Sequence, residues 1–319
     1  MALRRATPFL ILACGVVIVS TASILIRYAQ GEGVPSLTIA TVRLGLAALI
    51  LTPIVWARSS RELLSLRPRE LALALLSGAL LAVHFWSWIG SLAYTSVASS
   101  TALVTTNPLW VGLASVLILG ERLSRKTIAG IVLTLAGSAL IFASDSSSQN
   151  ATLQPDPMLG NLLALLGAVA ASGYLLIGRA LRGRVGLLAY IWLAYGTAAV
   201  LLLVAVGTTG QTLLGYSMLA YTAMIGLALG PQLLGHTAFN WALRHLSATF
   251  VAVSILGEPV GSALLALLLF GERFAPLQLA GFLLLLGGIY LAARGERPVN
   301  GSGVSNGPSL PAGTPERTS

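Results

Sequence analysis

The sequence predicts an all-α membrane protein of ten transmembrane helices, arranged as two inverted five-helix repeats (5+5) with both termini in the cytoplasm. Three observations predict this fold: a very low charge content, apolar blocks of bilayer length, and a sequence motif that occurs twice. Of the 319 residues, 56% are hydrophobic and only 9% are charged. A soluble domain carries about 25% charged residues, and a soluble globule of this length could not cover its surface with so few charges.

Ten apolar blocks of about 20 residues each have the length that crosses a bilayer as a helix. Helices are expected rather than a barrel, because a helix satisfies its own backbone in lipid and the blocks lack the alternating polarity of barrel strands. The first block is longer than a signal-peptide core and ends at Arg27 and Tyr28, so it is expected to remain as a span. The blocks cover residues 8–28, 37–57, 71–93, 98–119, 127–143, 158–180, 187–206, 216–241, 247–270 and 276–294.

The positive charges predict the orientation of the spans. With the N-terminus inside, most of the 19 basic residues fall on the cytoplasmic side, and the outside receives only Arg27 and Arg273. The net charge of +9 is therefore interpreted as a topogenic signal that also suits anionic lipid, and not as a nucleic-acid-binding surface. Residues 144–157, which include no Lys or Arg, are expected to form a periplasmic linker. Residues 295–319, rich in Gly, Ser and Pro, are expected to be a disordered cytoplasmic tail.

The repeated sequence motif divides the chain into two units of five expected spans. A shift of 151 residues superimposes Asn107-Pro108 on Glu258-Pro259, and Gly120-Glu121-Arg122 on Gly271-Glu272-Arg273. Because five is an odd number, the second unit must enter the membrane inverted relative to the first. Inverted repeats around a midplane site are typical of many secondary transporters, and a duplication kept only for structural reasons is the alternative. The two units cover residues 8–143 and 158–294.

Two five-helix units that each end with Pro, Gly-Glu-Arg, Ala-Gly and Gly in this order resemble the EamA domains of the drug/metabolite transporter superfamily. Through "HFWSW" at 84–88 and "TTNPLW" at 105–110, the chain is most similar to the bacterial inner-membrane exporters of aromatic amino acids. This resemblance implies export of aromatic or other apolar amino acids, or of flat cationic compounds. It also implies a cavity formed by four helices of each half, with the fifth and tenth spans outside it.

Polar residues inside lipid are costly and usually face the bundle interior or a wet cavity. In the third expected span, His84 and Trp88 lie four residues apart on one helical face. They are candidates for binding an aromatic or zwitterionic substrate by stacking and hydrogen bonding. The alternatives are a hydrogen bond between helices for His84 and ordinary packing for Trp88. Trp86 points elsewhere and is expected to face lipid or to be packed.

The eighth expected span carries a polar stripe just after Pro231. Gln232, His236 and Asn240 follow one another at intervals of four residues, and the first two are the stronger candidates for lining the cavity. Hydrogen bonds between helices are the alternative role for this stripe. In the sixth span, Tyr174 is a further candidate for lining the inner half of the cavity, with packing as its alternative.

Asn107 and Glu258 occupy equivalent positions in the two halves, each followed by a proline. A proline frees a carbonyl and kinks a helix, so Pro108 and Pro259 are candidate hinges, and a fixed bend is the alternative. Glu258 is the only acid well inside a span; it could take up a proton for coupling, receive a substrate ammonium group or pair with Arg43. Arg43 could snorkel to the outer surface or hold a substrate carboxylate.

Other repeated residues are expected to be structural. Two acids and two arginines at the Gly-Glu-Arg ends are expected to form ion pairs that pin helix termini: Glu121, Arg122, Glu272 and Arg273. Four glycines at intervals of seven are expected to let helices approach closely and to pack the fifth and tenth spans: Gly130, Gly137, Gly281 and Gly288. Self-association through them would give a weak homodimer; otherwise the chain is a monomer.

The sequence contains no constellation typical of an enzyme. It has no metal-ligand cluster, no nucleotide-binding loop and no Gly-x-Ser-x-Gly, so we expect neither a cofactor nor direct use of ATP. The function predicted is an inner-membrane transporter that exports aromatic or apolar amino acids, or similar small metabolites, by alternating access. The alternatives are an exporter of drugs, quaternary cations or other metabolites with the same fold, a channel, and a non-transporting membrane scaffold or receptor.

Overall fold

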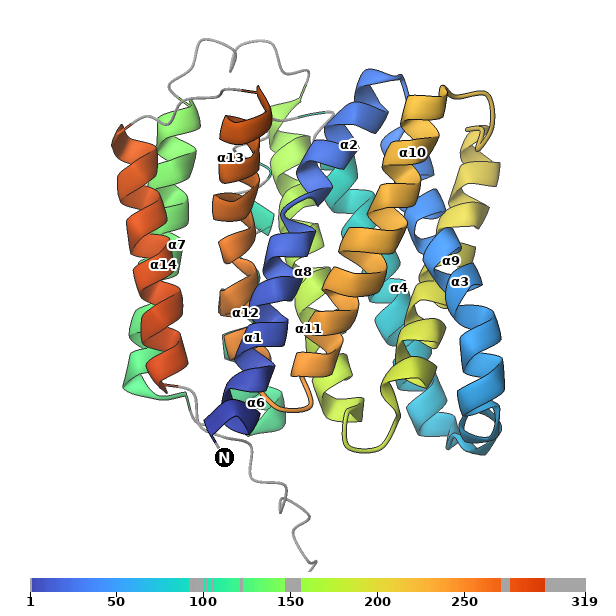
Figure 1. Cartoon of the computed structure of the whole chain (residues 1–319), viewed down its shortest axis with the longest axis horizontal. Helices are drawn as coiled ribbons and strands as arrows, with labels where there is room; N and C mark the ends of the chain where they lie inside the picture. The colour runs from blue at the N-terminus through green and yellow to red at the C-terminus, as the bar shows by residue number, and fades with distance from the viewer. Residues whose placement is uncertain are drawn as a thin grey trace, which may run out of the picture.

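A computed structural model describes the chain at residues 2–91, 94, 100, 103–104, 106–120, 123–146, 156–270 and 276–295. These residues are helical or in short connections, and none of them lies in a strand (Figure 1). The helices are α1 (Ala2–Val19), α2 (Ala22–Gly31), α3 (Ser36–Ser65), α4 (Pro68–Ser91), α6 (Asn107–Leu119), α7 (Arg125–Ser146), α8 (Pro157–Leu181), α9 (Leu187–Thr209), α10 (Met218–Leu227), the π-helix η2 (Ala228–His236), α11 (Thr237–Ala242), α12 (Ala248–Ile255), α13 (Gly257–Phe270) and α14 (Pro276–Gly295).

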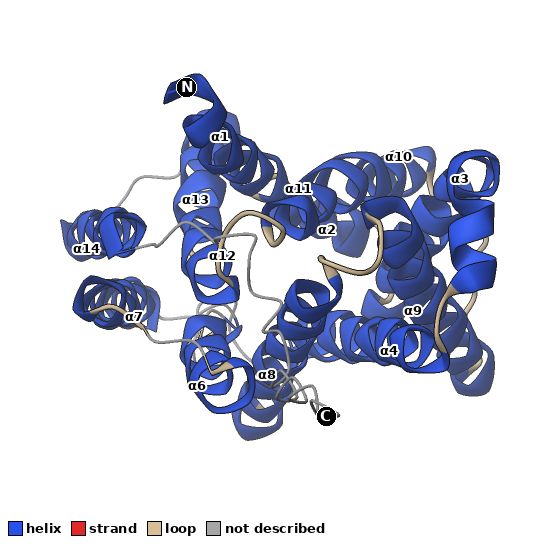
Figure 2. Ribbon diagram, turned by 90° about the horizontal axis from the view of Figure 1, so that it is seen from below, coloured by secondary structure: helices blue, strands red, loops and turns tan. Residues whose placement is uncertain are grey.

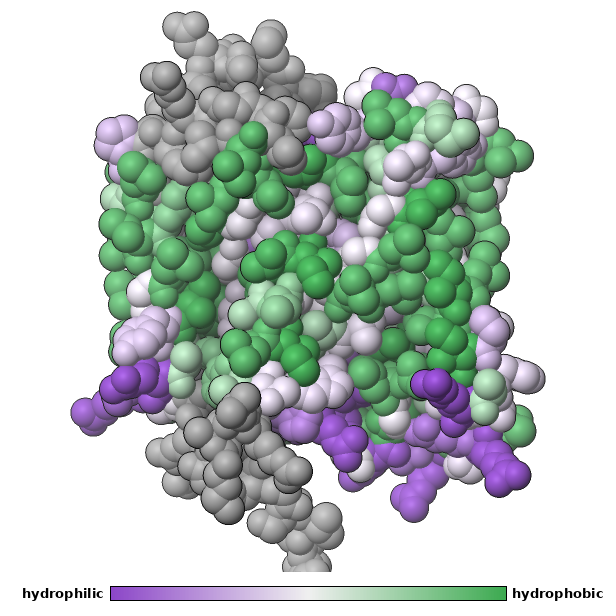
Figure 3. Space-filling view, viewed as in Figure 1, coloured by the Kyte–Doolittle hydropathy of each residue, from purple (hydrophilic) through white to green (hydrophobic). Residues whose placement is uncertain are grey.

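The helices have the lengths and hydropathy of a multi-pass membrane protein. Six stretches are long and apolar enough to cross a membrane: Ala6–Gly31, Ser36–Ser65, Pro68–Ser91, Met158–Leu181, Leu187–Thr209 and Met218–Ala242. Shorter apolar helices cover Asn107–Ile118, Ala248–Ser262 and Leu279–Gly295. A hydrophobic band runs across the molecule, and strongly hydrophilic side chains gather at its lower end (Figure 3). The prediction of a helical membrane protein is therefore confirmed.

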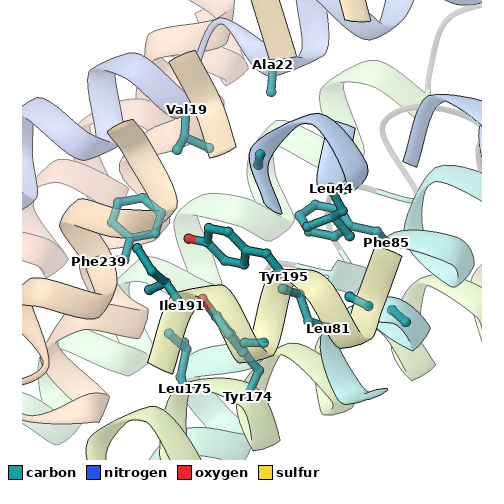
Figure 4. Packing of buried hydrophobic residues seen from close by; sticks show 14 of the residues in the cluster. Val19, Ala22, Leu44, Leu81, Phe85, Tyr174, Leu175, Ile191, Tyr195 and Phe239 are labelled. Atoms are coloured by element: carbon teal, nitrogen blue, oxygen red, sulfur yellow. The ribbon is translucent and has the colours of Figure 1, made fainter. Parts of the chain in front are cut away.

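The two halves of the chain interlock instead of forming two separate bundles. From the first half, α4 packs along α8 and α3 along α9. From the second half, η2 and α11 pack on α1, and α10 packs on α2. The buried cluster runs without interruption across both halves, with Leu44 and Phe85 from the first half and Tyr174, Tyr195 and Phe239 from the second (Figure 4). Any pocket in this interior is therefore lined by both halves.

Helices α7 and α14 form a pair at one edge of the molecule, beside the remaining helices (Figure 2). Their backbones approach closely at glycines: a Cβ on Gly130 would lie 2.7 Å from the carbonyl oxygen of Gly288, and one on Gly137 would lie 2.6 Å from that of Gly281. Small residues allow such approaches between membrane helices. The expected packing of the fifth and tenth spans through these glycines is confirmed.

Several helices are interrupted in the interior. The first expected span breaks between α1 and α2 at Ser20 and Thr21, and the ninth breaks at Leu256, between α12 and α13. The break at Ser20 lies against α13, because Ser262 Oγ donates a hydrogen bond to the Ser20 carbonyl at 2.9 Å. The eighth span contains η2, where Pro231 has no N–H for the helical hydrogen-bond pattern. Irregular backbone at membrane depth is tolerated where protein surrounds it.

The prolines proposed as hinges lie at the starts of helices. Pro108 is the second residue of α6, and Pro259 is the third residue of α13. A proline is compatible with the first turn of a helix, where its missing N–H has no intrahelical partner in any case. In the ninth span, the expected kink therefore takes the form of a break that precedes the proline.

The close approach of α7 and α14 gives a matched pair of variants on adjacent glycines. In Gly288→Ala the new Cβ would meet the Gly130 carbonyl oxygen and the Thr134 side chain at 2.7 Å, whereas Gly287 has nothing within 4 Å. We expect Gly288→Ala to destabilise the protein by about 1–3 kcal/mol through overpacking. We expect Gly287→Ala to be neutral, or stabilising by up to about 1 kcal/mol, because alanine favours helix. Thermal unfolding of the two purified variants in detergent tests this, and equal melting temperatures would contradict the packing described.

Candidate functional site

A cavity lies between the interlocked halves. It contains about 720 Å³ of space between protein atoms, its open mouth included. Its described lining comes from α1–α4, α6, α8, η2 and α11–α13, and none of it from α7 or α14. This agrees with the implied exclusion of the fifth and tenth spans. It differs from the implied four helices per half, because α9 contributes no described lining residue and packs behind α3 and α4 instead.

Most of the predicted site residues meet in this cavity. Seven of the eight candidate binding residues line it: Arg43, His84, Trp88, Asn107, Tyr174, His236 and Glu258. The eighth, Gln232, is fully buried but lies behind the lining, in contact with Arg43. Asn240, the weaker candidate on the same stripe, does not line the cavity either. The four residues expected to form ion pairs lie outside the described residues: Glu121, Arg122, Glu272 and Arg273.

His84 and Trp88 form a stacked pair on the cavity side of α4. Their ring centroids are 5.9 Å apart and their planes differ by only 9°. The two alternatives considered for His84 occur together, because it lines the cavity and its Nδ1 also lies 2.9 Å from the Gly167 carbonyl oxygen on α8. The indole nitrogen of Trp88 is buried and has no hydrogen-bond partner. Trp86 is 46% exposed, on the outer surface of the bundle.

Arg43 does not snorkel to the surface, because only 1% of it is exposed. Its Nε donates a hydrogen bond of 2.8 Å to Gln232 Oε1. The guanidinium carbon lies 4.2 Å from the centre of the Phe85 ring, within the range of a cation–π interaction. Both terminal nitrogens of the guanidinium are buried without a hydrogen-bond partner. The group is thus held from one side and free on the other.

Glu258 and Asn107 line the same cavity from the starts of α13 and α6. The carboxylate of Glu258 does not pair with Arg43, whose terminal nitrogens have no partner. The backbone carbonyl of Glu258 accepts a hydrogen bond of 3.3 Å from Ser20 Oγ, which ties it to the break between α1 and α2. The side-chain oxygen of Asn107 is buried and unpartnered, while its backbone carbonyl accepts a bond of 3.2 Å from Ser172 Oγ.

His236 lies in an aromatic surrounding made by both halves. Its ring centroid is 5.5 Å from that of Phe85 and 5.6 Å from that of Phe239, and its Nδ1 is buried without a partner. Phe85 and Phe239, which also line the cavity, are not among the predicted residues. A shift of 152 residues superimposes His84 on His236. This equivalence of the two histidines in the sequence could have indicated that they and their neighbours Phe85 and Phe239 belong to one site.

A polar network adjoins the cavity at Tyr174. Asn240 Nδ2 donates hydrogen bonds to the Tyr174 hydroxyl and, at 2.8 Å, to the His236 carbonyl. The Tyr190 hydroxyl donates to the Tyr174 carbonyl at 3.3 Å and lies 2.6 Å from Ser77 Oγ. Asn240 and Tyr190 therefore act as interhelical links behind the cavity.

Arg182, just beyond the end of α8, continues this network toward the end of the bundle. Its guanidinium carbon lies 4.2 Å from the centre of the Tyr190 ring, and its Nε donates to the Gly178 carbonyl at 3.2 Å. Only 5% of this residue is exposed, and removal from water lowers the pKa of its guanidinium below the ordinary value. The network thus runs from the cavity to the buried positive charge of Arg182, in the connection between α8 and α9.

Comparison with known proteins gives matches over nearly the whole helical part of the chain. The EamA-like transporter family matches residues 7–143 and 158–294. The uncharacterized protein PA1977 of Pseudomonas aeruginosa is 35% identical over 176 residues, which are 55% of this chain and 57% of that protein. The uncharacterized transporter YetK of Bacillus subtilis is 24% identical over 62% of this chain and 60% of that protein. The matches thus span under two thirds of the length of these two relatives.

Two further comparisons cover more of the chain. An uncharacterized transporter of Clostridium kluyveri is 23% identical over 229 residues, which are 71% of this chain and 73% of that protein. A solved crystal structure superposes with a TM-score of 0.77, covering 91% of this chain and 97% of that chain at 18% identity. This structural likeness shows the fold alone.

The bond between Arg43 and Gln232 gives a test by a double-mutant cycle. Gln232→Leu would leave the buried Nε of Arg43 unpartnered as well, so we expect it to destabilise the protein by about 1–3 kcal/mol. Removing both partners, in Arg43→Met with Gln232→Leu, should cost less than the sum of the single changes, because no stranded donor remains. Unfolding of the four proteins in detergent measures the coupling. Additivity within about 0.5 kcal/mol would contradict the proposed energetic link.

Proposed function

The chain belongs to the EamA-like transporter family, and from that premise we propose that it exports aromatic or other apolar amino acids, or similar small metabolites, through its central cavity. Members of the family are membrane transporters and not enzymes. The observation that carries the substrate class is an aromatic cavity that contains one buried arginine and one glutamate, Arg43 and Glu258. Aromatic and apolar walls suit a flat side chain, and the two opposite charges suit the backbone of an amino acid.

The proposed membrane arrangement has ten spans in two inverted repeats, residues 8–143 and 158–294. Residues 144–157 form a periplasmic linker and residues 295–319 a cytoplasmic tail. Both termini lie in the cytoplasm of a bacterial-type cell, with the chain in its inner membrane. The support is the distribution of basic residues along the sequence, together with the hydrophilic lower end in Figure 3.

The proposed mechanism is alternating access, with hinges at Pro108 and Pro259. Its support is the breaks in the helices that line the cavity, at Ser20 and at Leu256. Such breaks provide a few residues at which the backbone can bend between packed segments. Inverted repeats also allow two asymmetric states in which the halves exchange their conformations.

The alternative cargo, a drug or quaternary cation, is less well supported by the cavity. A permanent cation that enters it would meet the Arg43 guanidinium, whose free nitrogens would stay unpartnered. No feature of the described residues favours a non-transporting scaffold or receptor over a transporter.

Trp86 and Trp88, two residues apart on α4, give a matched test of the cavity. Trp88→Ala removes a ring that lines the cavity and stacks on His84, whereas Trp86→Ala removes a ring on the outer surface. Loss of one aromatic contact costs about 0.5–1.5 kcal/mol beyond the lost area. We therefore expect Trp88→Ala to lower the initial rate of L-tryptophan or L-phenylalanine flux into proteoliposomes about tenfold. Trp86→Ala should transport at the wild-type rate, and equal rates in both variants would remove Trp88 from the site.

The proposed orientation can be tested by labelling engineered cysteines in a Cys14→Ser background. A membrane-impermeant maleimide applied to intact spheroplasts should modify Ser148→Cys, which lies in the proposed periplasmic linker. It should modify Gly183→Cys, which follows α8 among basic residues, only after the membrane is permeabilised. The reverse pattern would show that the topology is inverted. Labelling of both positions in permeabilised membranes serves as the control for reactivity.

A further inference from the structure

Several residues that line the cavity carry buried polar atoms without a hydrogen-bond partner. The two terminal nitrogens of Arg43 and the indole nitrogen of Trp88 are buried donors, and the side-chain oxygen of Asn107 is a buried acceptor; none of them has a hydrogen-bond partner. Nearly all buried polar groups in folded proteins are paired, because an unpaired one costs free energy. A set of unpaired groups around one cavity therefore points to a ligand that pairs with them.

Arg43 lines the cavity, and its guanidinium group is held in position by two neighbours. Gln232 Oε1 accepts the Nε hydrogen bond at 2.8 Å, and Phe85 lies against the face of the guanidinium. Gln232 is itself held within η2, where its carbonyl lies 3.5 Å from the Tyr195 hydroxyl. The remaining two nitrogens form the fork that matches a carboxylate in bidentate geometry. A lysine could not reproduce this arrangement, because an ammonium group has no planar fork.

The Glu258 carboxyl group belongs to the same cavity but forms no hydrogen bond with Arg43. Glu258 lines the cavity from α13, and no hydrogen bond joins its carboxylate to the Arg43 guanidinium. A simple cation would leave Arg43 unpaired, and a simple anion would leave Glu258 unpaired. A molecule with a carboxylate and an ammonium group close together pairs with both. The aromatic walls then cover its apolar side group.

We propose that Arg43 binds the carboxylate of a zwitterionic substrate through its two terminal nitrogens, and that Glu258 and Asn107 receive the ammonium group. Gln232 is the positioning residue that orients Arg43 and does not touch the substrate. Recognition therefore requires both charges of the amino-acid backbone. This inference deepens the proposed function and rests on it, since it assigns the chemistry by which the same cavity selects its cargo.

Three indole probes of nearly the same shape test the requirement for both charges. They are L-tryptophan, tryptamine, which lacks the carboxylate, and indole-3-propionate, which lacks the ammonium group. Equilibrium dialysis against the full chain in detergent should give the tightest binding for L-tryptophan, and each analogue should bind at least about tenfold more weakly. Equal affinities of the wild-type protein for L-tryptophan and tryptamine would overturn the role of Arg43, and this comparison needs no variant.

Variants assign the two charges to the two residues. Arg43→Gln should weaken the binding of L-tryptophan and indole-3-propionate about tenfold or more and leave the binding of tryptamine unchanged. Glu258→Gln should weaken the binding of L-tryptophan and tryptamine and leave the binding of indole-3-propionate unchanged. Gln232→Leu should follow the pattern of Arg43→Gln in milder form, which a merely structural role would not produce. Arg43→Lys keeps the charge without the fork and should recover only part of the affinity. Arg61→Gln, on the exposed end of α3, is the matched control and should bind like the wild type.

Transport and binding together separate this inference from the proposed function. If proteoliposomes carry no amino acid but binding of indole-3-propionate still depends on Arg43, the proposed function fails and the carboxylate site stands. If L-tryptophan is transported but Arg43→Gln and Glu258→Gln leave all three affinities unchanged, the function stands and the zwitterion site is overturned. Melting temperatures of each variant establish that it is folded before its affinities are compared.

Discussion

The central constraint on this molecule is a guanidinium group that is held away from water inside a bundle of apolar helices. A buried charge is costly unless other groups pair with it. Arg43 from the first half is supported by Gln232 from the second and by the Phe85 ring, and its two terminal nitrogens remain without a hydrogen-bond partner. The hydrogen bond between the halves and the free side of the guanidinium are two consequences of one placement. Stability and recognition thus depend on the same group.

The second half supplies that support through an irregular helix. Gln232 is located in η2 directly after Pro231, and the equivalent stretch of the first half, in α4, is regular α-helix. The histidines that the 152-residue shift relates differ accordingly. His84 Nδ1 is bonded to the Gly167 carbonyl, whereas His236 Nδ1 has no partner. The residue equivalent to Gly167 is Gly15, which lies where α1 passes close to η2. Two halves with the same pattern therefore have different conformations, as one state of an alternating pair would require.

Sequence alone predicted the helical membrane fold and the polar residues of the described cavity lining, because hydropathy and the cost of polar groups in lipid depend little on tertiary detail. Glycine spacing likewise predicted the contact of α7 with α14. The sequence could not place Gln232 behind Arg43, since the π-helix changes which face each residue occupies and periodicity assumes a regular helix. The break at Ser20 was also missed, because no proline or glycine marks it. Phe85 was missed because an aromatic residue in a span reads equally well as packing.

The polar network around Tyr174 is relevant to the proposed alternating access, which requires that each side of the cavity can open and close. Tyr174 lines the cavity, and its hydroxyl and carbonyl are occupied by Asn240 and Tyr190. One turn further along α8, Gly178 has no side chain, and a Cβ there would lie 2.9 Å from the Tyr190 hydroxyl, so the network is closely packed. If apolar side chains closed this side of the cavity, the proposed alternating access would expose hydrocarbon to water in each cycle. Hydroxyl and amide groups can exchange their internal hydrogen bonds for bonds to water at small net cost, so the tight packing at Gly178 is compatible with the opening that the proposed alternating access requires.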